Sequence, residues 1–149
     1  MRKERAVAIC FDRGSVLVIR RRKGGRRYTV LPGGGIEDGE DPFIAAVREL
    51  AEETGLSGTV VRHLTSVDHP DRTAHYFLLN VTPSRLTLGG PEADLQSTEN
   101  HYSPSWIPIT QLDTEPIVPE EVRAIIREAA RGEIAAQPTA TPVAPPRRR

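Results

Sequence analysis

The sequence contains one cysteine, Cys10, and no long hydrophobic run. A single cysteine excludes a disulfide within the chain and is typical of proteins kept in a reducing compartment. The longest apolar run covers residues 6–11, which is too short for a signal-peptide core or a membrane-spanning helix. We therefore expect a soluble, cytoplasmic protein that has no membrane partner.

The sequence also lacks net charge, because 20 Lys and Arg balance 20 Asp and Glu. The total therefore gives no reason to expect a specific nucleic-acid partner. The charges are nevertheless separated along the chain. Residues 1–27 contain ten Lys and Arg and two acids, whereas residues 37–53 contain seven acids and one Arg. Such a pair of segments suits the binding of a polyanion through a divalent cation, or it forms two solvated surfaces of opposite sign.

The length of 149 residues fits one domain that is large enough to bury a core. No internal repeat is visible. We expect the domain to occupy residues 1–132. Residues 133–149 are rich in Pro, Ala and Thr and end in three arginines, so they are expected to form a flexible tail.

Strands and helices follow from the pattern of apolar residues. Strands are predicted at residues 5–11, 15–21, 28–31, 59–67 and 73–81, with a short final strand at residues 106–109. A polar segment without periodicity, residues 88–105, is predicted to be a long loop. A helix is predicted at residues 119–132. Strands, an intervening helix and a closing helix predict an α+β fold or a sheet sandwiched between helices.

A further helix is predicted to begin at Pro42, with Asp41 as N-cap and Gly55 as the residue that ends it. Its apolar stripe is expected to consist of Phe43, Val47, Leu50 and Ala51.

The segment RELAEETGL, residues 48–56, places Glu49, Glu52 and Glu53 at helical spacings of i, i+3 and i+4. Like charges at these spacings destabilise a helix by a few tenths of a kcal/mol per pair, roughly. Magnesium prefers oxygen ligands shared between carboxylates and substrate phosphates, so a bound cation would remove the repulsion. Arg48 is four residues before Glu52 and can pair with it.

The spacing of these residues resembles the Nudix box, G-x5-E-x7-R-E-U-x-E-E-x-G-U, where U is aliphatic. Gly34, Glu40, Arg48–Glu49 and the residues up to Leu56 fill every specified position. The box covers residues 34–56, and the resemblance extends over about residues 4–132.

The resemblance implies a Nudix-type α/β/α sandwich with a mixed β-sheet and a loop–helix–loop that binds Mg²⁺ or Mn²⁺. It implies that the metal ligands are Glu49, Glu52 and Glu53, with a backbone carbonyl of Gly33 or Gly34. Glu40 and Arg48 would orient these ligands. Glu49, Glu53 and an acid in a later loop would be the catalytic residues, for which Glu99 is preferred to Glu92. The family often forms homodimers.

The implied activity is hydrolysis of a diphosphate linkage in a nucleoside triphosphate or a nucleoside-diphosphate derivative, a small-molecule substrate. Arg20 and Arg21 are candidates for contacts with substrate phosphates. Tyr28 is a candidate for stacking on a base, as are Tyr76, Tyr102 and Trp106, although all four are equally suited to the core or its rim. Two alternatives remain open: a pyrophosphatase of ADP-ribose or a nucleotide sugar, and a nucleotide-sensing module without catalysis.

Overall fold

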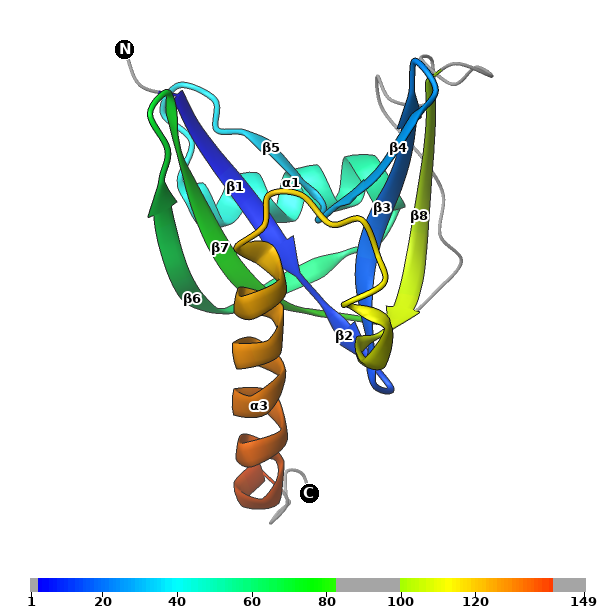
Figure 1. The fold of residues 1–149 in the computed structure, drawn as a ribbon. Helices are drawn as coiled ribbons and strands as arrows, with labels where there is room; N and C mark the ends of the chain where they lie inside the picture. Colours follow the sequence, from blue (N-terminus) through cyan, green and yellow to red (C-terminus); the bar gives the residue numbers. More distant parts are fainter. Residues whose placement is uncertain (1–2, 83–99, 141–149) are drawn as a thin grey trace.

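The computed structural model describes residues 3–82 and 100–140, which form two four-stranded sheets and two α-helices (Figure 1). The first sheet contains β1 (Lys3–Ile9), β5 (Gly33–Gly35), β6 (Gly58–Asp68) and β7 (Arg72–Val81). The second contains β2 (Phe11–Asp12), β3 (Ser15–Lys23), β4 (Arg26–Val30) and β8 (Asn100–Pro108). The helices are α1 (Pro42–Thr54) and α3 (Val122–Ala140), and a 3₁₀ turn covers Ile109–Gln111.

The first sheet is mixed. Its strand order is β5-β1-β7-β6, and β1 and β7 are parallel whereas the other neighbours are antiparallel. In the second sheet, β8 pairs with β3 over nine residues, and β2 and β4 pair with successive parts of β3. This arrangement confirms the predicted mixed sheet of an α+β sandwich.

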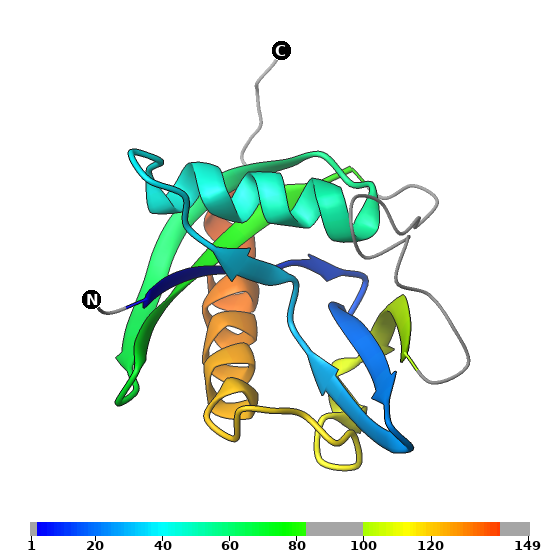
Figure 2. The same ribbon diagram turned by 90° about the horizontal axis from the view of Figure 1, so that it is seen from above.

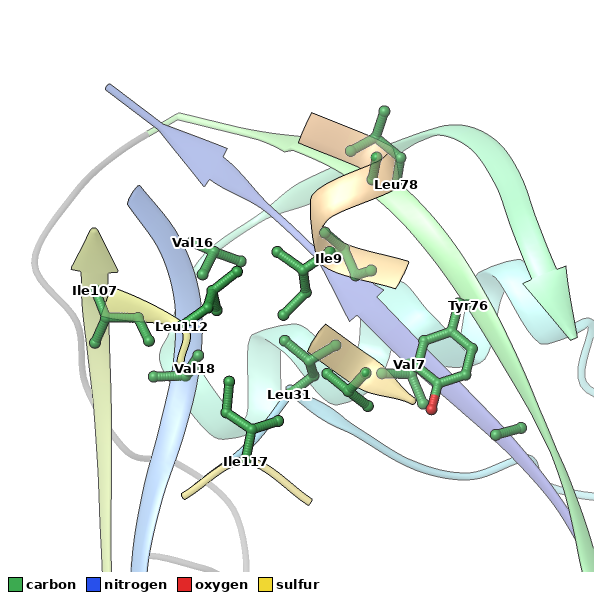
Figure 3. Close-up of a cluster of buried hydrophobic side chains, with 14 residues drawn as sticks. Val7, Ile9, Val16, Val18, Leu31, Tyr76, Leu78, Ile107, Leu112 and Ile117 are labelled. Carbon is green, nitrogen blue, oxygen red and sulfur yellow. The ribbon is translucent and has the colours of Figure 1, made fainter. Parts of the chain in front are cut away.

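Both faces of β1 are buried from Ala6 to Ile9. Because successive side chains of a strand point to opposite faces, Ala6 and Ala8 of β1 pack in one apolar cluster and Val7 and Ile9 in the other. The first cluster includes Leu50 of α1. The second includes Ile126 of α3 together with the labelled side chains in Figure 3. Helices α1 and α3 thus cover opposite faces of the first sheet (Figures 1 and 2).

The predicted strand at residues 5–11 is divided at Cys10. The chain leaves the first sheet after Ile9 and enters the second at Phe11. The carbonyl of Cys10 accepts a hydrogen bond from the Leu17 amide at 3.0 Å. Both strand segments carry apolar side chains because both sheets are buried, so hydrophobicity gives no sign of the change of sheet.

The predicted stripe of the first helix was wrong in two positions. Phe43 is 46% exposed and Ala51 is also exposed, whereas Ala45, Ala46, Leu50 and Thr54 are buried. The helix packs through its two buried alanines because it lies close to β1 and to the all-glycine strand β5. The small alanine side chains of α1 and the absence of side chains in β5 permit this close approach.

The predicted loop at residues 88–105 was wrong from residue 100 onward, whereas the predicted strand at residues 106–109 was confirmed at residues 106–108. Strand β8 begins at Asn100 and ends at Pro108, and Ile109 lies in the 3₁₀ turn. Its polar residues are tolerated because pairing with β3 satisfies the backbone groups. Residues 88–99 lie outside the described residues.

The closing helix differs at both ends from the prediction of residues 119–132. Helix α3 begins at Val122 and continues through Gly132 to Ala140. Its residues Val122, Ile126 and Ala129 are buried. A glycine inside a helix costs only about 1 kcal/mol, and the good helix formers Glu-Ile-Ala-Ala-Gln follow it. No helix in the described parts of the chain combines the length and apolar character needed to cross a bilayer.

Candidate metal and diphosphate site

Helix α1 begins and ends where the sequence predicts, although the Asp41 side chain makes no capping hydrogen bond. Asp41 precedes the helix in an extended conformation, and Pro42 occupies its first turn, where a missing N–H costs nothing. Gly55 ends the helix with a φ of 77°, and its N–H donates to the Ala51 carbonyl, a left-handed conformation that glycine adopts without strain. Leu50 anchors the middle of the helix in the core. Glu49, immediately before it in the sequence, is largely covered, with its side chain 12% exposed.

Arg48 joins the helix to the preceding loop. Its Nε donates to Glu40 Oε2 at 2.8 Å and its Nη2 donates to Glu40 Oε1 at 3.0 Å. Nη2 also donates to the Gly35 carbonyl at 3.0 Å. A guanidinium that binds a carboxylate through two parallel hydrogen bonds fixes geometry as well as charge. Arg48 therefore holds the loop at residues 35–40 against the start of the acidic edge.

Two of the three helix glutamates also contact Arg48. Nη1 donates to Glu49 Oε2 at 3.0 Å and lies 3.5 Å from both carboxylate oxygens of Glu52. The predicted pairing of Arg48 with Glu52 is thus present, but the hydrogen bonds to Glu40 and Glu49 are shorter. The arginine offsets part of the repulsion among the glutamates.

The pKa of Glu40 is lowered to about 2, mainly by the hydrogen bonds from Arg48 and next by the one from the Glu37 amide. The same contacts with Glu40 raise the pKa of Arg48. Both groups therefore stay ionised throughout the physiological range, as an orienting pair requires.

The glycine loop receives the other carboxylates. The Gly33 N–H donates to Glu53 Oε1 at 2.8 Å. A Cβ built on Gly34 would lie 2.4 Å from the carboxyl carbon of Glu49. The Glu49 carboxylate thus occupies the space where any other side chain at position 34 would begin. Glu49 and Glu53 meet the backbone of Gly33 and Gly34, whereas the Glu52 side chain is 38% exposed.

The predicted substrate residues divide between the two faces of the second sheet. Arg21 pairs with Tyr28 on one side and Tyr102 on the other. Its guanidinium carbon lies 5.3 Å from the Tyr28 ring centroid and 4.3 Å from that of Tyr102. Arg21 lies on the same face as Leu17, four residues earlier in β3, and Leu17 packs in the cluster with α1. The face that carries Arg21, Tyr28 and Tyr102 is therefore the face that α1 covers further along the strand.

Arg20 points to the opposite face. It forms two hydrogen bonds with Glu115, from Nε at 2.9 Å and from Nη2 at 3.2 Å. The Thr29 hydroxyl donates to the same carboxylate at 2.8 Å. Arg20 and Arg21 thus lie in different environments, although they are adjacent in sequence.

A family model for the NUDIX domain matches residues 1–129. The chain belongs to the Nudix family. It is similar to the mutator protein MutT4 of Mycobacterium tuberculosis, with 31% identity over 117 residues. The match covers 73% of this chain and 44% of that protein. It is also similar to diphosphoinositol polyphosphate phosphohydrolase 2 of Mus musculus, with 36% identity over 88 residues. That match covers 54% of this chain and 47% of the mouse protein.

The fold is shared with solved Nudix structures. One is described as an ADP-ribose pyrophosphatase from Streptococcus suis, with a TM-score of 0.67 and 19% identity over 88% of this chain and 93% of that one. The chain spans about half the length of the curated relatives that it matches. Nudix hydrolases generally use divalent metal ions.

The Nudix box of this chain offers a donor set that suits such an ion. All the donors are oxygens, as a hard cation prefers, and the absence of a side chain at Gly34 makes room for the Glu49 carboxylate. In the described parts of the chain, however, no group of three His, Cys, Asp or Glu side chains is arranged so that it could hold a metal ion. Arg48 and the Gly33 amide hold the carboxylates instead, so coordination requires small movements of the glutamate side chains.

Two site features were not predicted. Glu115 is 95 residues from Arg20 in the sequence, and no local signal links them. Tyr102 was expected in a loop, but it lies in β8, where it pairs with Arg21 of β3. Tyr76 packs in the core and is 2% exposed. Glu92 and Glu99 lie outside the described residues, so their catalytic role stays a prediction.

Proposed function

We propose that this chain is a Mg²⁺-dependent hydrolase of a diphosphate linkage in a nucleoside triphosphate or a nucleoside-diphosphate derivative, with Mn²⁺ as an alternative ion. The observation that carries the proposal is the meeting of α1 with the glycine loop. Arg48 binds Glu40 and Glu49, and the Gly33 amide binds Glu53. Such an arrangement brings carboxylates to a glycine backbone that phosphate groups can approach closely.

In this proposal Glu49, Glu52 and Glu53 hold the ion, together with a carbonyl of Gly33 or Gly34. A bound Mg²⁺ supplies charge neutralisation at the diphosphate oxygens and lowers the pKa of a bound water. Arg48 and Glu40 keep the ligands oriented, in the way that outer partners of metal ligands usually act. Glu49, Glu53 or Glu99 would accept the proton of the attacking water, because a carboxylate within reach serves as a general base.

Arg21 and Tyr28 are proposed to contact the rest of the substrate. They lie on the face of the second sheet that α1 covers, and Arg21 can bind a phosphate while an aromatic ring accepts a stacked base. Arg20 is less suited to this role in the present arrangement, since Glu115 occupies its guanidinium.

The substrate class stays open within this proposal. The names of similar proteins point to ADP-ribose and to diphosphoinositol polyphosphates. ADP-ribose or a nucleotide sugar is the alternative substrate, and a nucleotide-sensing module is the alternative of another class.

The test is a panel that measures release of phosphate or pyrophosphate from these compounds, with Mg²⁺ or Mn²⁺, for the wild type and for Glu52→Gln and Glu53→Gln. Glu128→Gln is the matched control, because Glu128 is an exposed glutamate on α3. We expect both box variants to lose most turnover and the control to keep it. Absence of turnover for every compound, with nucleotide binding retained, would favour the sensing module. Unchanged turnover in the box variants would refute the proposed ligands.

A further inference from the structure

A chain of four hydrogen-bonded side chains crosses the first sheet on its neighbouring strands β6, β7 and β1 (Figure 1). His63 Nε2 lies 2.9 Å from the hydroxyl oxygen of Ser66, and this oxygen lies 2.7 Å from His75 Nδ1. The second ring nitrogen of His75, Nε2, lies 2.6 Å from Glu4 Oε1. We call these four residues the Ser66 relay. None of them belongs to the Nudix box or to the second sheet.

The register of the strands brings the two histidines to one serine. Ser66 stands opposite His75, and His63 stands opposite Phe77, two residues further along β7. Residues two apart in a strand share a face, so His63 and Ser66 also share a face although they are three residues apart in β6. The register shift between His63 and Thr65 makes this possible, because a β-bulge re-aims the side chains of a strand.

Glu4 reaches the relay from β1, where it stands two residues before Ala6, the partner of His75. Ala6 packs in the apolar cluster that includes residues of α1, so the relay lies on this face of the sheet. Ser66 is nevertheless exposed, and the side chains of His75 and Glu4 are 20% and 45% exposed. Water could therefore satisfy these groups, and burial alone does not require them to bond to one another.

The hydrogen bonds of the relay run in one direction. An ionised carboxylate only accepts hydrogen bonds, so His75 Nε2–H donates to Glu4. The other nitrogen of a neutral imidazole carries a lone pair, so Nδ1 of His75 accepts the hydrogen bond of the Ser66 hydroxyl. His63 Nε2–H then donates to the Ser66 oxygen. The Ser66 hydroxyl thus points at a base that a carboxylate holds from its far side, which is the arrangement of an activated nucleophile.

We propose that Ser66 is a nucleophile that reacts with activated carboxylic esters, with His75 as its general base and Glu4 as a positioning residue. The Ser66 oxygen forms a bond to the ester carbonyl carbon while its proton passes to His75 Nδ1. The bond between that carbon and the leaving-group oxygen then breaks, and the leaving group takes the proton from His75. Water hydrolyses the resulting serine ester by the same route, which returns Ser66 and releases a carboxylic acid.

The exposed position of the relay limits the esters that it can use. A positioned general base contributes about 10²- to 10⁴-fold to a rate. A preformed donor for the oxyanion contributes about 10²- to 10³-fold more, and on this exposed surface water is that donor. We therefore expect reaction with esters that have a good leaving group, such as p-nitrophenyl acetate, and not with simple alkyl esters.

The test measures acetylation of Ser66 by p-nitrophenyl acetate in EDTA, with an acid quench and mass spectrometry of the peptides. Ser57, an exposed serine directly before β6, is the control within the same molecule. We expect Ser66 to be acetylated at least tenfold faster than Ser57 in the native protein, and the difference to disappear in urea. Peptide mapping is used because exposed histidines also cleave this ester without leaving an acetylated serine.

Single variants test the roles of the other residues. His75→Gln removes the base and is expected to lower the rate of Ser66 acetylation at least tenfold. Glu4→Gln keeps the side-chain length without the charge and should lower this rate several-fold, whereas Glu4→Asp keeps the charge and should recover part of the loss. The matched control is His101→Gln, which removes an exposed histidine of β8 outside the relay and should keep the wild-type rate.

Equal acetylation of Ser66 and Ser57 in the native wild type, or an unchanged rate in His75→Gln, would overturn the proposal. The comparison of the two serines decides it even if a variant fails to fold, which thermal unfolding would reveal. The measurement needs neither a metal ion nor a nucleotide, so its result does not depend on the proposed diphosphate hydrolysis.

Discussion

The three consecutive glycines of β5 are predicted to respond differently to the same substitution by alanine. Their backbones do not require glycine, because none of Gly33, Gly34 and Gly35 has a φ in the positive region. What differs is the neighbour that an added Cβ would meet. The series therefore separates fold stability from the position of the Glu49 carboxylate, which we propose to be catalytic.

Gly34→Ala is the central member of the series. Its Cβ would lie 2.4 Å from the carboxyl carbon and from Oε2 of Glu49, whereas ordinary contact begins at 3.4 Å. The Glu49 carboxylate must then move by at least the difference, 1.0 Å. A glutamate side chain is flexible at its end, so the fold loses little stability. A displacement of this size at a reacting centre costs about 100-fold in rate, and we expect a fall of that order in kcat/KM.

Gly33→Ala is expected to act on stability instead. Its Cβ would lie 2.6 Å from the backbone oxygen of Ala6 and 3.0 Å from Cα of Val7. Backbone atoms cannot turn aside, and forcing an extra methyl group into a packed site costs about 1–3 kcal/mol. Gly35→Ala meets nothing within 4 Å and serves as the control. It should keep its activity and match or exceed the wild type in stability, by up to about 1 kcal/mol.

The assay compares the free energy of unfolding, from denaturant titration, with kcat/KM on the best substrate of the panel. The reasoning predicts low activity with normal stability for Gly34→Ala and low stability for Gly33→Ala. Normal kcat/KM in Gly34→Ala would refute it, as would a loss of activity in Gly35→Ala equal to that in Gly34→Ala.

Three further predictions concern single residues. Arg48→Ala should weaken Mn²⁺ binding about 10- to 100-fold, since it removes the partner that orients the proposed ligands. Arg48→Lys should recover little of this binding, because lysine cannot bind a carboxylate through two parallel hydrogen bonds. Titration calorimetry measures the Mn²⁺ affinity of both variants. The contribution of Glu40 to stability should be complete above pH 4.5, the ordinary pKa of a glutamate, and should be lost as the pH falls towards 2, because the pKa of Glu40 is lower in the folded state. In Glu40→Gln the free energy of unfolding should therefore vary less with pH in this window. An unchanged slope of that free energy against pH would contradict the prediction. Burial raises the pKa of the Cys10 thiol to about 12. A thiol reagent should therefore label Cys10 only after the protein unfolds. Rapid labelling of the native protein would contradict this by showing that the thiol is accessible.

Local sequence signals predicted the limits of helix α1 well. The limits of α1 follow from Asp41-Pro42 and Gly55, which act through the backbone of a few adjacent residues. The resemblance implied that Glu40 and Arg48 support the metal ligands, and the structure joins these two residues by parallel hydrogen bonds. These features depend on residues close together in the chain.

Contacts between distant residues were not predictable in the same way. The division of the first strand at Cys10 depends on which sheet each half joins, and both halves are equally apolar. Strand β8 exists because β3 offers a partner for its backbone, and its own polar sequence favours a loop. Glu115 meets Arg20 only after the segment before α3 has docked beside β4, where the Thr29 amide donates to the Pro116 carbonyl at 2.9 Å.

The central claim is that α1 and the glycine loop hold a divalent cation that hydrolysis requires. It is tested most directly by the initial rate of hydrolysis as a function of Mg²⁺ concentration, measured in parallel for the wild type and Glu53→Gln. We expect no hydrolysis in EDTA, a rate that rises to saturation with Mg²⁺ in the wild type, and a curve shifted to higher Mg²⁺ with a much lower maximum in Glu53→Gln. Equal rates with and without Mg²⁺, or superimposable curves for the two proteins, would contradict the account.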